Sequence, residues 1–290
     1  MNIEERKLRR RREKASRRFS VLIALVIGFV FGVAFTILLS QKYTIVISDP
    51  SEIKTVDYKA RDISPTITPT PNPKTDAKNS AQNGRTVVID AGHQKKGNFG
   101  KEPIAPGASK TKAKVASGTT GVSTKIPEYI VTLDVSKLLE YELESRGYDV
   151  IMVRETHDVD ISNSQRAEVA NKAKADAFIR IHCNGSESSS AKGALTMCQT
   201  AKNPYCGEFY TQSRNLSDCV IDGLCAETGA KNLGVSETDT MSGINWCKVP
   251  VTIVEMGFMS NPEEDELLCN KEYQKKLAQG IANGIDNYFK

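Results

Sequence analysis

The chain has 290 residues, with 39% hydrophobic and 26% charged positions and seven cysteines. This composition excludes a collagen, a fully disordered chain and a membrane protein with many spans. The net charge is +4, but residues 1–18 carry nine Lys/Arg against three Glu, while the remaining 272 residues carry 30 against 32. Because phosphate binding needs basic charge on the folded domain, this split argues against a nucleic-acid partner.

Residues 21–39 form a single uncharged segment directly after Arg17 and Arg18. As a helix rising about 1.5 Å per residue, this segment spans roughly 28 Å of hydrocarbon. The basic residues before it predict that 1–20 are a cytoplasmic tail and that the rest lies outside the cytoplasm. A cleaved signal peptide is the alternative, but the apolar run exceeds the usual ~7–15 residues and no small-x-small site follows closely. We expect a single-pass anchor in the cell membrane.

The rest of the chain divides into a spacer and a domain. Residues 40–84 are Thr/Pro-rich without apolar periodicity, which predicts a disordered extracytoplasmic linker. Residues 85–290 are long enough for one sizeable core. Apolar spacing in this part predicts alternating strands and helices, and therefore a single α/β domain with a mostly parallel central sheet flanked by helices. We expect strands at 86–90, 149–153, 177–181, 194–198 and 251–255, and helices at 128–145, 164–175, 209–228 and 272–289.

All seven cysteines lie in the second half of this domain, and no CxxC pair is present. A zinc ribbon or finger is therefore disfavoured. Export permits disulfides, and Cys198 with Cys206 is a plausible short bridge. Burial as small apolar side chains explains most of the cysteines equally well.

Two of the three histidines are expected at the carboxyl ends of strands. His93 ends VVIDAGH and His182 ends AFIRIH, and functional groups of open α/β sheets collect at this edge. Gly92 permits a sharp turn just before His93. The third histidine, His157, lies in the polar stretch RETHDVD and is expected to be a solvent-facing loop residue, with a ligand role left open by the neighbouring Asp158. Asp90, three residues before His93, is either a metal ligand or a carboxylate that fixes the tautomer of the His93 ring, and the second role is favoured.

Two carboxylates are candidates for joining these histidines. Glu128 follows Pro127 at the expected start of a helix, and Glu255 ends the strand VTIVE. Two imidazoles and one carboxylate form a catalytic zinc site with a fourth position for water. Glu255 is the candidate general base, because a carboxylate ending a buried strand needs a partner or a function. Each of these residues taken alone also has a purely structural explanation. Glu128, for example, is an acidic residue in the first turn of a helix, where it interacts favourably with the helix dipole.

Four motifs together carry a family resemblance. They are VVIDAGH, PEYIVTLDVSKLLEYELESRGYDVIMVRETHD, SQRAEVANKAKADAFIRIHCNG and VPVTIVEMGFMSNPEED. In order and spacing the chain resembles the zinc-dependent N-acetylmuramoyl-L-alanine amidases of amidase type 3. This resemblance implies that His93, Glu128 and His182 hold Zn²⁺ and that Glu255 is catalytic. It also implies cleavage of the amide between N-acetylmuramic acid and L-alanine in peptidoglycan.

The chain departs from the family pattern at three places: Gln94 instead of the usual glycine, Cys183 instead of a small residue, and a longer connection over 94–127. None removes a ligand, and strand alternation is expected to turn Cys183 away from His182. By the same resemblance Arg166 and Asn171 are expected to pack within the domain. Trp246 either lines the substrate groove or fills the core.

The resulting hypothesis is a bacterial, membrane-anchored zinc amidase acting on the cell wall, with its oligomeric state open. Two alternatives stay open. A zinc peptidase acting on the stem peptide would share the metal site, and a catalytically silent wall-binding domain would share the fold. Retention of all four candidate residues argues against the silent domain.

Overall fold

The computed structural model describes residues 84–290. The expected tail at 1–20, the expected membrane span at 21–39 and the linker before residue 84 lie outside the described residues. Among the residues that are described, no helix combines the length and apolar character needed to cross a membrane.

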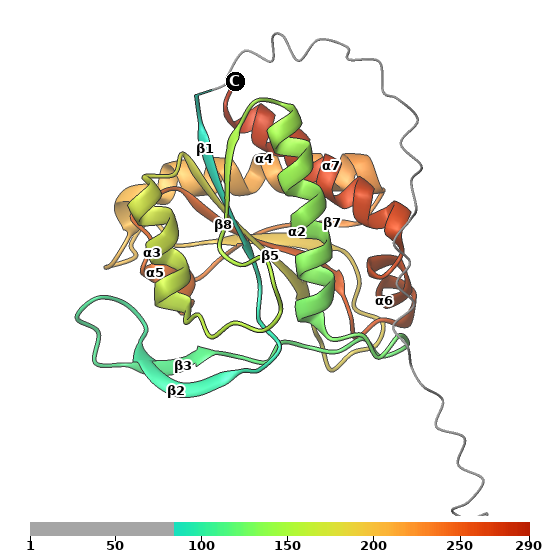
Figure 1. Ribbon diagram of the computed structural model, residues 1–290, viewed down its shortest axis with the longest axis horizontal. Coiled ribbons are helices and arrows are strands. Elements are labelled where there is room, and N and C mark those ends of the chain that lie inside the picture. Colours follow the sequence, from blue (N-terminus) through green and yellow to red (C-terminus); the bar gives the residue numbers. More distant parts are fainter. Residues whose placement is uncertain (1–83) are drawn as a thin grey trace, which may run out of the picture. The chain divides into compact units, whose positions relative to one another are not determined.

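A six-stranded sheet forms the centre of the domain, in the order β4-β1-β5-β8-β6-β7. Neighbours from β4 to β8 pair in parallel, β6 runs antiparallel to β8, and β7 is parallel to β6. The mostly parallel sheet predicted from the sequence is therefore confirmed (Figure 1). The strands are β1 Thr86–Ala91, β4 Asp149–Met152, β5 Ala177–Asn184, β6 Ala194–Cys198, β7 Asn232–Glu237 and β8 Val251–Phe258.

Helices cover both faces of this sheet (Figure 1). One face packs on α2 (Glu128–Ser145), α4 (Tyr210–Thr228) and α7 (Lys271–Tyr288), and the other on α3 (Asn163–Ala173) and α5 (Ser242–Asn245). A further helix, α6 (Pro262–Leu268), follows β8, and a short 3₁₀ turn at Gly207–Phe209 precedes α4. The predicted helix at 128–145 has these bounds in the structure, and the other three differ by one or two residues.

Successive side chains of β5 point to opposite faces of the sheet. Ile179, Ile181 and Cys183 belong to the large core under α2, α4 and α7. Arg180 and His182 point to the opposite face, because neighbouring residues of a strand alternate. The expected orientation of Cys183 away from His182 is thus confirmed. All seven cysteines are free, so the Cys198–Cys206 bridge is not formed.

A two-stranded hairpin occupies the segment expected to be a long loop. It consists of β2 (Asn98–Pro103) and β3 (Thr111–Val115), and it projects from the sheet (Figure 1). The Trp246 indole donates to the Pro103 carbonyl at 3.0 Å, and Glu102 accepts from the backbone and hydroxyl of Ser164. Trp246 therefore packs at the core edge and tethers this hairpin.

Candidate metal centre and active site

His93, Glu128 and His182 converge from three separate elements. His93 follows β1, Glu128 begins α2 and His182 lies on β5. His93 Nε2 is 3.1 Å from His182 Nδ1, and each of these nitrogens is 3.2 Å from Glu128 Oε1. Within residues 84–290 these three form a cluster of metal-ligating groups. The structure thus brings together the three residues that the sequence predicts as metal ligands.

The His93 ring is held by a backbone contact. His93 Nδ1 lies 2.9 Å from the Ala116 carbonyl oxygen and donates a hydrogen bond to it, so in the neutral ring Nε2 keeps its lone pair toward the cluster. Its backbone has φ 60°, a left-handed conformation rare outside glycine. Burial lowers the pKa of His93, but the hydrogen bond and charge of Glu128 outweigh it and raise the pKa.

Backbone amides orient Glu128. Glu128 Oε2 accepts from Thr119 N at 2.8 Å, and Oε1 accepts from Cys183 N at 3.0 Å. Pro127 precedes the helix in an extended conformation, as expected for the residue that sets its entry. Burial raises the pKa of Glu128, but hydrogen bonds from the two histidines outweigh it and hold the pKa below its usual range. Glu128 is thus a fixed, negatively charged group.

His182 is suited to bind metal as a neutral imidazole. Burial lowers its pKa to about 4, so the ring is uncharged near neutral pH. With both imidazoles neutral, His93 Nε2 carries no proton and lies 3.2 Å from Glu128 Oε1. Two hydrogen-bond acceptors then face each other with no hydrogen between them. His182 Nε2 is buried and lacks a hydrogen-bond partner among the described residues. A cation among these donors removes the conflict, and two histidines with one glutamate form a known zinc set.

The narrow space beside His182 leads to a prediction at Gly92. A Cβ added to Gly92 would lie 2.4 Å from Cε1 of the His182 ring. We expect Gly92→Ala to displace this ring and to lower metal affinity by about tenfold or more, as small displacements of ligand-supporting groups do. Metal titration checks this. The control is Gly185→Ala, where the nearest atom is 3.4 Å away, and equal affinity in both variants would contradict the prediction.

Glu255 lies on β8 directly beside His182. The two residues are register partners of β5 and β8, and both line a cavity of about 450 Å³. Glu255 Oε2 is buried without a hydrogen-bond partner among the described residues. Burial, followed by the negative charge of Glu128, raises the pKa of Glu255 to about 8.

Asp90 does not contact the His93 ring, which corrects the role expected for it. Its two carboxylate oxygens bind Arg166 at 2.6 Å and Arg180 at 2.9 Å, and all three side chains are buried. The carbonyl of Ala116 takes the tautomer-fixing role instead. Burial raises the pKa of Asp90, but the two guanidinium groups outweigh it and hold the pKa well below its usual range.

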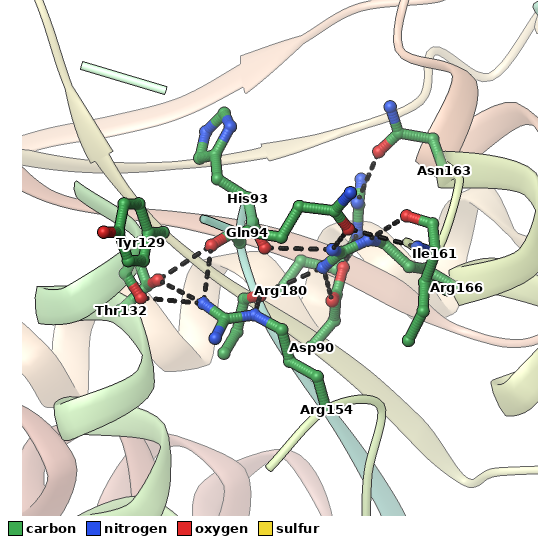
Figure 2. Close-up of polar contacts among 12 residues, drawn as sticks. Asp90, His93, Gln94, Tyr129, Thr132, Arg154, Ile161, Asn163, Arg166 and Arg180 are labelled. Atoms are coloured by element: carbon green, nitrogen blue, oxygen red, sulfur yellow. Dashed lines mark hydrogen bonds and ion pairs between the residues drawn. The ribbon is translucent and has the colours of Figure 1, made fainter. Parts of the chain in front are cut away.

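The turn that carries His93 is fixed by arginines (Figure 2). Arg166 donates to the Ala91 and His93 carbonyls, and Arg154 donates to the Ala91 and Gly92 carbonyls. The role of Arg166 therefore goes beyond the packing expected for it.

Other residues of the sequence analysis have structural contacts outside the cluster. Gln94 is buried, and its side-chain oxygen accepts hydrogen bonds from the Arg166 guanidinium and from Ile161 N. These bonds connect the segment after β1 to α3 and the segment before it. Asn171 bonds the backbone of Trp246, in line with its expected structural role. His157 is half-buried against the Tyr129 ring and is not part of the metal-ligating cluster.

Sequence reasoning missed Arg154 and Arg180. A signal for Arg180 was present, because a charge inside the apolar strand AFIRIH requires a buried partner, and Asp90 in TVVIDA is its complement. The two strands pair with Asp90 opposite Arg180. Arg154 gives no such signal, since its hydrogen-bond partners in the described domain are backbone carbonyls and one hydroxyl.

Comparison with known proteins decides the family. The sequence profile of the family described as N-acetylmuramoyl-L-alanine amidase matches residues 87–287. The chain belongs to this amidase family. The resemblance carried by the four motifs is thereby confirmed, and zinc dependence is the norm of this family.

The relatives of this amidase-family chain match mainly its described domain. It is 31% identical over 206 residues to the uncharacterized protein YqiI of Bacillus subtilis, covering 71% of this chain and 85% of YqiI. It is 28% identical over 224 residues to N-acetylmuramoyl-L-alanine amidase LytC of the same species, covering 76% of this chain but 39% of LytC. The crystal structure of apo Ami1, an N-acetylmuramyl-L-alanine amidase from Mycobacterium abscessus, matches with a TM-score of 0.64 and 26% identity, covering 71% of this chain and 99% of that one.

Proposed function

We propose that this protein is a zinc-dependent peptidoglycan hydrolase that cleaves the amide between N-acetylmuramic acid and L-alanine. The observation that carries the proposal is the convergence of His93 Nε2, His182 Nδ1 and Glu128 Oε1, with both histidines lining the same cavity as Glu255. Membership in the amidase family supports the same reaction.

The cluster is where the metal would be held. His93, Glu128 and His182 supply two neutral nitrogens and one carboxylate oxygen. When bound, zinc supplies a Lewis acid for the scissile carbonyl and lowers the pKa of a water molecule to about 7. Backbone groups hold the ligand side chains in position before a metal binds: the Ala116 carbonyl orients His93, and Thr119 N orients Glu128.

Glu255 is proposed as the general base. Its Oε2 is buried without a hydrogen-bond partner in the described domain, and the residue lines the cavity that contains the two histidines. This oxygen accepts the proton of the attacking water and passes it to the leaving L-alanine amine. Glu128 is the charge that helps to raise the pKa of Glu255. Neutralising Glu128 with a bound cation therefore favours the carboxylate form that a base requires.

Product analysis distinguishes this reaction from the zinc peptidase alternative. The full-length protein is incubated with purified peptidoglycan, and the soluble products are analysed by mass spectrometry. An amidase releases peptides with free L-alanine N-termini and leaves the glycan intact. Shortened peptides on intact muramoyl groups would instead identify a peptidase, and an absence of products would support a silent wall-binding domain.

The proposed location follows from the N-terminal sequence. The basic residues 1–18 and the uncharged run 21–39 support a single-pass membrane anchor with the domain on the cell-wall side. Protease treatment of intact protoplasts tests this orientation, since an external domain is digested and an internal one is protected.

A further inference from the structure

The active-site cavity has a second set of lining residues that the reaction described above does not use. Besides His93, His182 and Glu255, this cavity of about 450 Å³ is lined by Lys112 of the hairpin, Arg180 of β5 and Ser242 of α5. We refer to Lys112, Arg180 and Ser242 as the cationic wall.

Arg180 contributes charge that its ion pair does not cancel. Asp90 is shared between Arg166 and Arg180, so one carboxylate faces two guanidinium groups. Arg180 uses Nε for Asp90 and Nη2 for the amide oxygen of Asn163, while Nη1 has no protein acceptor in the described part of the chain. A Cβ at Gly243 would lie 1.9 Å from this Nη1. Because residue 243 is a glycine, there is room for the Arg180 guanidinium beside the cavity.

Lys112 brings a second positive charge. Among residues 84–290 its ammonium group makes neither an ion pair nor a hydrogen bond. The acid opposite it in the hairpin, Glu102, is already engaged by the backbone and hydroxyl of Ser164. Residues 94–116 carry six lysines against this one glutamate, whereas the rest of 85–290 carries 18 Lys/Arg against 26 Asp/Glu. The charge of Lys112 is thus not paired with the acid of its own hairpin.

Ser242 supplies an unused hydrogen-bond group. Its side-chain oxygen is buried and has no partner within the described residues, although the residue lines the cavity and is only 5% exposed. Buried hydroxyl groups are rarely left without a partner. An acceptor atom of a ligand in the cavity would satisfy this hydroxyl beside the two cations.

We propose that the cationic wall is a carboxylate-binding subsite that selects the stem peptide of the substrate; this rests on the amidase function proposed above. On the muramoyl side of the scissile amide the sugar carries only acetamido and hydroxyl groups, which are uncharged. The carboxylates belong to the peptide. The wall therefore binds the peptide side, and we assign to it the α-carboxylate of the residue after L-alanine, because this is the first free carboxylate beyond the scissile amide.

Two soluble substrates that differ in one group test this subsite. They are N-acetylmuramoyl-L-alanyl-D-isoglutamate and its D-isoglutamine counterpart, which replaces the α-carboxylate by a carboxamide. For the full-length protein we expect kcat/KM to be about tenfold higher with the carboxylate, since a charged acceptor strengthens the hydrogen bonds. Lys112→Met should abolish most of this preference through KM, and Lys112→Arg should restore it. The control Lys110→Met changes an exposed lysine of the same hairpin outside the cavity and should keep the preference.

Binding of the released peptide separates this inference from the amidase proposal. Calorimetry measures the affinity of L-alanyl-D-isoglutamate for the full-length Glu255→Gln protein, with and without Lys112→Met or Ser242→Ala. We expect each added substitution to weaken binding, Lys112→Met by about tenfold. Active protein that cleaves both substrates equally overturns the subsite and leaves the amidase function standing. Protein that cleaves neither substrate but binds the peptide through Lys112 supports the subsite and overturns the amidase function.

Discussion

Glu255→Gln is expected to abolish most amidase activity while zinc content and folding stay unchanged. Glutamine has the same shape but cannot accept the proton of the attacking water at the position of Glu255 Oε2. General base catalysis contributes about 10²- to 10⁴-fold, and we expect kcat to fall by about that factor. Release of L-alanine N-termini from muropeptides measures the activity, and elemental analysis measures the metal.

A matched control separates this effect from the loss of any negative charge. Glu266→Gln removes an exposed carboxylate on α6, and it should leave kcat unchanged. The interpretation would be wrong if Glu255→Gln kept full turnover. It would also be wrong if the variant lost its zinc, because Glu255 would then act on the metal site itself.

The second large effect is expected at Arg166. This side chain is fully buried, pairs with Asp90 and donates to the His93 carbonyl. Arg166→Met fills a similar volume but leaves Asp90 with Arg180 as its one ion-pair partner. Removing one partner of a buried pair costs about 3–5 kcal/mol, which corresponds to a Tm lower by roughly 6–20 °C for a domain of this size. Thermal unfolding measures the stability, and metal titration measures whether His93 is displaced.

Lys172→Ala provides the comparison on the same helix. Lys172 forms an exposed ion pair with Glu168 at 3.8 Å, and exposed pairs contribute about 0–1 kcal/mol. The variant should unfold near the wild-type temperature. Equal stability of the two variants would contradict the role given to Arg166.

The sequence predicted those elements whose apolar spacing is regular. The helix 128–145 and the strand 194–198 have the predicted bounds because each buries one side against a core. The hairpin was not predicted, since 98–103 and 111–115 contain few apolar residues and bury only one position each. Its stability comes instead from contacts made by Trp246 and Glu102, which are distant in the sequence from their partners.

The candidate site was predicted in part for a similar reason. Strand ends place His93 and His182 at one edge, and β8 places Glu255 next to His182 by register. The contact predicted between Asp90 and the His93 ring is wrong, because nearness in sequence does not imply contact between side chains. Alternation along β1 instead directs its carboxylate to Arg180 on the neighbouring strand. Side-chain direction, rather than sequence distance, decides such contacts.

Zinc analysis of ligand variants tests the central claim most directly. Elemental analysis of the purified full-length protein should find about one zinc ion per chain, and removal by a chelator should abolish peptidoglycan cleavage until zinc is restored. His93→Ala combined with His182→Ala should remove the metal, because one carboxylate remains of the three ligands. Full zinc content in this double variant, or undiminished cleavage by metal-free protein, would contradict the assignment of this cluster as the catalytic centre.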